Sequence, residues 1–152
     1  MRVTIDRRGG DTPWDNSSIE KLALFTLERM KAPEACELSI SLVDAEEIRK
    51  LNREYRDIDR PTDVLSFECD DPWGQYESNE IIEIGDVVIA PDIVDKQRSE
   101  FGRSFEEEAS LMLVHSILHL LGYDHIDDDE AREMEAIEKD ILDAYGLTGI
   151  RS

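Results

Sequence analysis

The sequence is poor in histidine, cysteine and basic residues, and each shortage narrows the possible functions. Its 152 residues include three histidines and two cysteines, and 17 lysines and arginines stand against 37 aspartates and glutamates. Cys36 and Cys69 lack metal-site spacing and form no disulfide framework, so we expect both to be reduced. A net charge of −20 repels nucleic acid at long range and argues against bulk electrostatic binding of RNA, and we expect no DNA partner.

Long hydrophobic runs are also missing. No apolar stretch reaches membrane-spanning length, and residues 1–5 are too short and too soon followed by charge to be a signal peptide. We therefore expect a cytoplasmic protein without a membrane partner. The length, with no repeat or linker, predicts a single domain, residues 1–152, that can build a hydrophobic core.

All three histidines lie within residues 115–125, which read H-S-I-L-H-L-L-G-Y-D-H. His115 and His119 are four positions apart, so a helix places them on the same face. Gly122 tolerates the left-handed conformation that ends a helix, and such a turn can bring His125 back to the other two. Three imidazoles at this spacing predict a metal site with an open fourth position, rather than three unrelated core histidines.

Zinc is the expected ion for three imidazole ligands, although another divalent metal such as nickel also suits them. Bound zinc lowers the pKa of a water molecule to roughly 7, so that hydroxide is available near neutral pH. The histidine spacing matches the metzincin pattern H-E-x-x-H-x-x-G-x-x-H, but Ser116 stands where those proteases carry their glutamate base. Peptide hydrolysis by that mechanism therefore lacks its base, whereas attack on a phosphodiester needs mainly a cation to hold the phosphate.

Basic residues are concentrated in one short segment. Five of the 17 fall within residues 49–60: Arg49, Lys50, Arg53, Arg56 and Arg60. This segment predicts either a small cationic patch on an acidic protein or an ordinary solvated helix face, and charge alone does not choose between them.

Hydrophobic periodicity predicts an α+β fold, a small four-stranded mixed sheet packed by about five helices. The strands are expected at residues 2–5, 37–43, 64–67 and 82–89. The helices are expected to begin at Ser17 or Ser18, Asp44, Pro91, Ser104 and Asp127, in the order β-α-β-α-β-β-α-α-α. The helix after Ser104 is apolar almost all round, so we expect a central, metzincin-like histidine helix, while residues 70–80 form a polar excursion.

The histidine motif resembles that of the YbeY family, bacterial metal-dependent endoribonucleases of ribosomal RNA maturation and ribosome quality control. Two other segments are similar to blocks of the same family: residues 55–67, which begin Y-R and end D-R-P-T-D-V-L-S-F, and residues 84–89, I-G-D-V-V-I. The agreement runs from about residue 40 to residue 145 in the same order. The family more often has glycine where this chain has Ser116.

The resemblance implies zinc ligands at His115, His119 and His125 and a catalytic Arg56 that holds RNA phosphate near the metal. It implies a zinc-dependent, single-strand-specific endoribonuclease that matures the 3′ end of 16S ribosomal RNA, with the small ribosomal subunit or its assembly factors as partners. Two alternatives remain open. One is a metallopeptidase-like metallohydrolase, and the other is a non-catalytic ribosome-assembly factor whose structural metal takes a fourth ligand, with Cys69 as the candidate.

Four other residues have weaker predicted roles. We expect Asp63 to shape the turn before its strand and Met134 to pack in the core. Ser66 is expected on a strand that can face the cleft. Asp124 has three possible roles: a hydrogen-bonding partner of a metal ligand, a proton carrier, or a solvated surface residue.

Overall fold

The computed structural model describes residues 1–9 and 12–150, in which four strands, five α-helices and one short 3-10 helix occur. In chain order they are β1 (Arg2–Arg7), α1 (Asn16–Arg29), β2 (Cys36–Leu42), α2 (Ala45–Arg56), β3 (Val64–Glu68), β4 (Ile82–Ile89), α3 (Pro91–Arg98), η1 (Ser99–Phe101), α4 (Phe105–Leu120) and α5 (Asp128–Tyr145). The α+β class and the order of the elements confirm the prediction.

The four strands form one mixed sheet in the order β1-β2-β4-β3. β1, β2 and β4 are parallel, whereas β3 runs antiparallel to β4 and forms an edge. Side chains of a strand alternate between the two faces of the sheet, so neighbouring residues of β3 face different surroundings. Ser66 faces α4 and donates to the Ser116 carbonyl at 3.4 Å, whereas Leu65 and Phe67 belong to the apolar cluster beneath α2.

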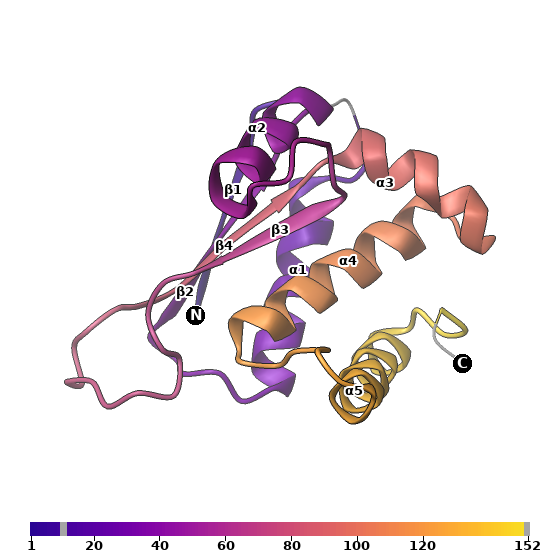
Figure 1. Cartoon of the computed structure of the whole chain (residues 1–152). Coiled ribbons are helices and arrows are strands. Elements are labelled where there is room, and N and C mark those ends of the chain that lie inside the picture. The colour runs from indigo at the N-terminus through magenta and orange to yellow at the C-terminus, as the bar shows by residue number, and fades with distance from the viewer. Residues whose placement is uncertain (10–11, 151–152) are drawn as a thin grey trace.

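The helices cover the two faces of the sheet unequally. α1, α4 and α5 pack together on one side, where most of the buried apolar side chains form the main core (Figure 1). α2 lies toward the opposite face, over a smaller cluster that includes Ile48, Leu65 and Val88. Among the described residues, the buried apolar cluster on this second face is much smaller than the main core.

α4 is the central helix of the main core. Its start is a capping box: the Glu107 backbone N–H donates to Ser104 Oγ at 3.1 Å, and the Ser104 N–H donates to the Glu107 carboxylate at 2.8 Å. Most of its residues from Ala109 onward are buried, so the helix is held by packing all round. The position and the cap of this helix confirm the prediction, and the histidines in its second half are thereby fixed relative to the sheet.

One of the predicted helix starts differs from the structure. α1 is capped by Asp15, whose carboxylate accepts from the Ser18 N–H at 2.7 Å, so the predicted cap at Ser17 or Ser18 is wrong. A carboxylate makes the same bond as a serine hydroxyl, and the pattern allowed either residue. Asp44 does cap α2, by accepting from the Glu47 N–H at 2.8 Å, and the Glu47 carboxylate contacts Arg8.

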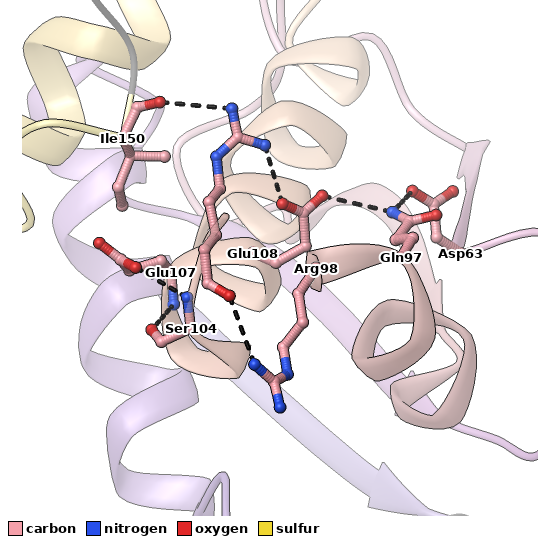
Figure 2. Close-up of polar contacts among 8 residues, drawn as sticks. Asp63, Gln97, Arg98, Ser104, Glu107, Glu108 and Ile150 are labelled. Atoms are coloured by element: carbon pink, nitrogen blue, oxygen red, sulfur yellow. Dashed lines mark hydrogen bonds and ion pairs between the residues drawn. The ribbon is translucent and has the colours of Figure 1, made fainter. Parts of the chain in front are cut away.

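A buried polar network ties α3 and α4 to the end of the chain (Figure 2). Arg103 donates to the Glu108 carboxylate at 2.8 Å and to the Ile150 carbonyl at 3.3 Å, and Glu108 is almost fully buried. Gln97 bridges Glu108, at 3.3 Å, to the carboxylate of Asp63, at 2.7 Å. The network therefore also fixes the turn that leads into β3, which is the role predicted for Asp63.

None of the helices in residues 1–9 and 12–150 is long and apolar enough to cross a membrane.

Candidate metal centre

The three histidines converge as the spacing predicts. His115 and His119 lie one turn apart on α4, with ring centroids 4.5 Å apart and their Nε2 atoms 3.0 Å apart. The His125 ring lies 5.3 Å from His115 and 5.0 Å from His119, centroid to centroid. One nitrogen from each ring falls within 4.8 Å of the other two. An ion held by nitrogens at about 2.1 Å in a tetrahedron needs them about 3.4 Å apart, which these positions approach.

The turn after α4 brings His125 to the other two histidines. Gly122 has φ of +102°, a conformation that a side chain would strain, and the Tyr123 N–H donates to the Leu118 carbonyl at 3.0 Å. The Asp124 carboxylate then accepts from the His125 N–H at 2.8 Å. Asp124 thus hydrogen-bonds the backbone of the third histidine, which is one of the three roles that the sequence left open.

Two acceptors orient the rings of the helical histidines. His115 Nδ1 lies 2.8 Å from the carboxylate of Glu138, a buried residue of α5, and His119 Nδ1 lies 3.0 Å from the Tyr123 carbonyl. A carbonyl only accepts, and so does an ionised carboxylate, so each Nδ1 carries the proton. Each Nε2 therefore turns a lone pair into the cluster.

Two lone pairs facing each other at 3.0 Å repel unless a cation lies between them. A proton is disfavoured there, because burial lowers the pKa of His119 and the neighbouring His115 lowers it further. Neutral imidazole nitrogens are good ligands for zinc and similar divalent ions. Their arrangement therefore fits a metal ion.

The histidines open into a cleft of about 520 Å³ between α2, β3 and α4. Arg56, the last residue of α2, lines this cleft together with Ser66, Asp124 and the three histidines. It is the one lysine or arginine among the described residues of the cleft wall. The structure thus brings the predicted phosphate-binding residue to the same cavity as the candidate ligands, although the two segments are far apart in the sequence.

Ion pairs within the protein occupy part of the predicted cationic segment, residues 49–60. Asp59 accepts from Arg49 at 2.9 Å and lies 4.0 Å from Arg53, so one carboxylate occupies two of the five basic residues. These pairs are exposed and contribute little to stability, but they neutralise that side of the helix. Arg56, by contrast, is part of the cleft wall.

Three other residues discussed from the sequence differ in burial and in their contacts. Met134 is buried in the main core, as expected, while contributing to a small cavity beside His115 and His125. Ser116 is buried, and its hydroxyl finds no hydrogen-bond partner among the described residues. Cys69 is exposed and is not part of the histidine cluster.

One contact of the centre and one contact at the end of its helix were missed from the sequence. Glu138 is one acid among 37, and only its placement on the facing turn of α5 singles it out. Trp73, in the excursion after β3, donates from its indole nitrogen to the Leu121 carbonyl at 2.8 Å. The polar composition of residues 70–80 gave no hint that this segment is fastened to the end of the histidine helix.

The sheet, the central helix and the cleft define a class: small α+β proteins that present a three-histidine candidate metal centre in an open cavity. Residues 7–146 match the family model described as endoribonuclease YbeY, and the chain belongs to that family. A relative named endoribonuclease YbeY from Caldanaerobacter subterraneus is 41% identical over 97% of this chain and 99% of its own. Another, from Listeria monocytogenes, is 37% identical over 88% of each chain.

A solved structure supports the fold. The solution structure of TM1509 from Thermotoga maritima has a TM-score of 0.59 and 26% sequence identity to this chain, and the match covers 99% of this chain and 95% of the other. The match to the family model and the named relatives confirm the predicted family resemblance.

Proposed function

We propose that this chain is a zinc-dependent endoribonuclease that cuts single-stranded RNA, with His115, His119 and His125 as the metal ligands. The observation that supports it most is the pair of Nε2 atoms 3.0 Å apart at an open cleft, with the Nδ1 atom of each ring already held by an acceptor. Membership in a family named for endoribonuclease activity supports the reaction class. The same three nitrogens also suit another divalent ion.

The residues of the cleft have separate roles in this proposal. A zinc ion in such a site acts as a Lewis acid and makes water nucleophilic near neutral pH. Arg56 binds the phosphate of the scissile nucleotide through its guanidinium, whose paired N–H groups match two phosphate oxygens. Glu138 holds the His115 ring in the orientation that the ion requires, and the Tyr123 carbonyl does the same for His119.

The proposed substrate is ribosomal RNA near the 3′ end of 16S RNA, cut during maturation and ribosome quality control in the cytoplasm. The net charge of −20 repels free RNA, so we expect the substrate to be delivered on the small ribosomal subunit or with its assembly factors. The chain is proposed to act as one unit, residues 1–152.

The two alternatives are less well supported. A metallopeptidase of metzincin type needs a carboxylate at position 116, where the structure has a buried serine hydroxyl that cannot take a proton near neutral pH. A structural metal is normally enclosed by four protein ligands. The cluster among the described residues contains three, and Cys69 is not a fourth.

Cleavage of an end-labelled single-stranded ribosomal RNA fragment tests the proposal. Zinc-loaded protein is expected to cut the fragment, and His119→Ala, purified in parallel, is expected to lose at least 100-fold in rate because it lacks one of the three ligands. Equal cutting by both proteins would assign the activity to a contaminant or another site. If neither cuts the free fragment, the same pair is assayed on small ribosomal subunits, and failure there as well would overturn the proposal.

A further inference from the structure

A second cavity lies on the other face of the sheet from the metal cleft. It measures about 360 Å³ and is open to solvent, and its wall is formed by α2 and by strands of the sheet. Its apolar lining comes from Leu51, Tyr55, Phe67 and Val88, and Ser41 and Asp86 add polar atoms. The reaction proposed above does not use this cavity.

Two aromatic rings, those of Tyr55 and Phe67, line this cavity. Tyr55 is 67% exposed, although it is a large aromatic residue. Its ring meets Phe67 edge-on, with centroids 5.1 Å apart, and Phe67 packs on the small core beneath α2. Phe67 thus holds the tyrosine at one contact, while most of the Tyr55 surface remains exposed and offers aromatic area to a flat partner.

The second cavity and the metal cleft lie on opposite faces of the sheet, but two elements contribute neighbouring residues to both walls. Along β3, Ser66 and Glu68 line the metal cleft, whereas Phe67 lines the second cavity. At the end of α2, Tyr55 lines the second cavity and the next residue, Arg56, lines the metal cleft. An extended strand held at Arg56 therefore needs to pass only the edge of the sheet to reach Tyr55.

We propose that the cavity beside Tyr55 takes one unpaired base of the same RNA strand that Arg56 and the metal centre hold, so that Tyr55 is a substrate-binding residue. The inference rests on the proposed nuclease function. A cation and an aromatic ring on adjacent residues form the combination with which proteins bind single-stranded nucleic acid, since the cation holds phosphate and the ring stacks on a base.

The lining chemistry fits a base better than a second phosphate. Arg8 also lines the cavity, but it is paired with Asp6 at 3.2 Å and Glu47 at 3.3 Å. Asp86 would repel a phosphate, whereas its carboxylate accepts from the exocyclic amino group of adenine, guanine or cytosine, and the Ser41 hydroxyl donates or accepts. An aromatic platform with a few polar atoms at its rim is how proteins hold unpaired bases.

The test uses the full-length chain in two backgrounds. In His119→Ala, which we expect not to cut, binding of a short single-stranded RNA is measured with 2-aminopurine placed at successive positions. In the wild-type background, kcat and KM are measured on the same RNA. Each background is combined with Tyr55→Ala, Tyr55→Leu or Tyr55→Phe. Tyr76→Ala is the matched control, because Tyr76 is also exposed but lies in the excursion after β3.

We expect one 2-aminopurine position to be quenched on binding and the quenching to be lost in Tyr55→Ala and Tyr55→Leu. RNA affinity should fall about tenfold in both variants, with KM raised and kcat retained, while Tyr55→Phe and Tyr76→Ala behave like the parent protein. Tyr55→Leu preserves the apolar contact with Phe67, so it separates loss of stacking from loss of folding, and thermal unfolding confirms that each variant is folded.

Other outcomes overturn the inference in distinguishable ways. If the parent protein cuts RNA but Tyr55→Ala and Tyr55→Leu match it in affinity and quenching, the cavity does not take a base and serves another partner, such as a protein segment. The proposed nuclease function would then stand. If the parent protein neither binds nor cuts RNA, free or on ribosomal particles, the proposed function fails and this inference fails with it.

Discussion

The proton positions of two imidazole rings decide what the candidate centre can bind. The sequence predicted which three histidines meet, because their spacing on a helix and across a glycine turn is local information. It could not predict Glu138, which lies 23 residues from His115 and reaches it only because α5 packs beside α4. The orientation of a ligand ring thus depends on a contact between helices.

Replacing Glu138 tests this orientation. Glu138→Gln removes the charge that holds the Nδ1 proton of His115, so the zinc affinity should fall about 10- to 100-fold, measured by competition with a chromophoric chelator. Glu133→Gln, an exposed residue on the same helix, is the control and should bind zinc like the parent protein. Unchanged affinity in Glu138→Gln would show that the carboxylate has no part in metal binding.

Arg56 carries the second prediction at this scale. Arg56→Ala should lower kcat/KM for RNA cleavage about 100-fold, because a preorganised cation that meets developing charge contributes on that order. Arg56→Lys keeps the charge but loses the bidentate contact with phosphate. Its kcat/KM should lie between that of Arg56→Ala and that of the parent protein. Arg53→Ala removes a cation one turn earlier, outside the cleft wall, and should stay within about twofold. Equal losses in Arg53→Ala and Arg56→Ala would indicate a general charge effect.

At the scale of single elements, periodicity gave β4 and α3 their observed bounds, since a doubly buried strand and a proline-started helix have strong local patterns. It could not give the order of the strands or the break in register between β2 and β4. The break falls between Glu37 and Leu38, opposite Glu83 and Gly85. Pairing across a sheet depends on residues distant in sequence, and only the glycine indicates where the ladder is disturbed.

Replacing Gly85 tests how closely β4 approaches β3 and α4. A Cβ at this position would lie 2.2 Å from the Phe67 carbonyl oxygen and 2.8 Å from a Leu120 methyl group, and φ is +146°. Gly85→Ala should lower the free energy of unfolding by about 3 kcal/mol, measured by denaturant titration.

Gly102→Ala is the matched control for Gly85→Ala. Its φ of +66° is also positive, but no atom lies within 4 Å of an added Cβ. It should cost only about 1 kcal/mol, the strain of the left-handed conformation alone. Equal costs at the two positions would mean that β4 does not approach β3 and α4 as closely as the structure shows.

The network of Figure 2 gives a second prediction for the elements. Arg103→Met leaves the Glu108 carboxylate buried without its cation, and the free energy of unfolding should fall by about 3 kcal/mol. Arg132→Met, which breaks an exposed pair with Asp129, should change it by less than about 0.5 kcal/mol. The double variant Arg103→Met/Glu108→Leu should recover part of the loss. No recovery would indicate that Arg103 acts mainly through the Ile150 carbonyl.

For the whole molecule, the fold class followed from the order of patterns, but the two cavities did not. Each forms where α2 meets the sheet, and the metal cleft also needs α4, whose histidines lie about sixty residues beyond Arg56 in the chain. The sequence also left the cationic segment undecided. In the structure, Arg49 and Arg53 form ion pairs with Asp59, whereas Arg56 lines the metal cleft.

The central claim is that the histidine centre holds the ion on which RNA cleavage depends. The most direct measurement prepares the protein at graded zinc occupancy and records both bound zinc per chain and the cleavage rate of single-stranded ribosomal RNA. We predict a rate that rises in proportion to occupancy and levels off at one ion per chain, and His119→Ala should show neither tight binding nor cleavage. Full cleavage by metal-free protein, or a rate that does not follow occupancy, would contradict the account.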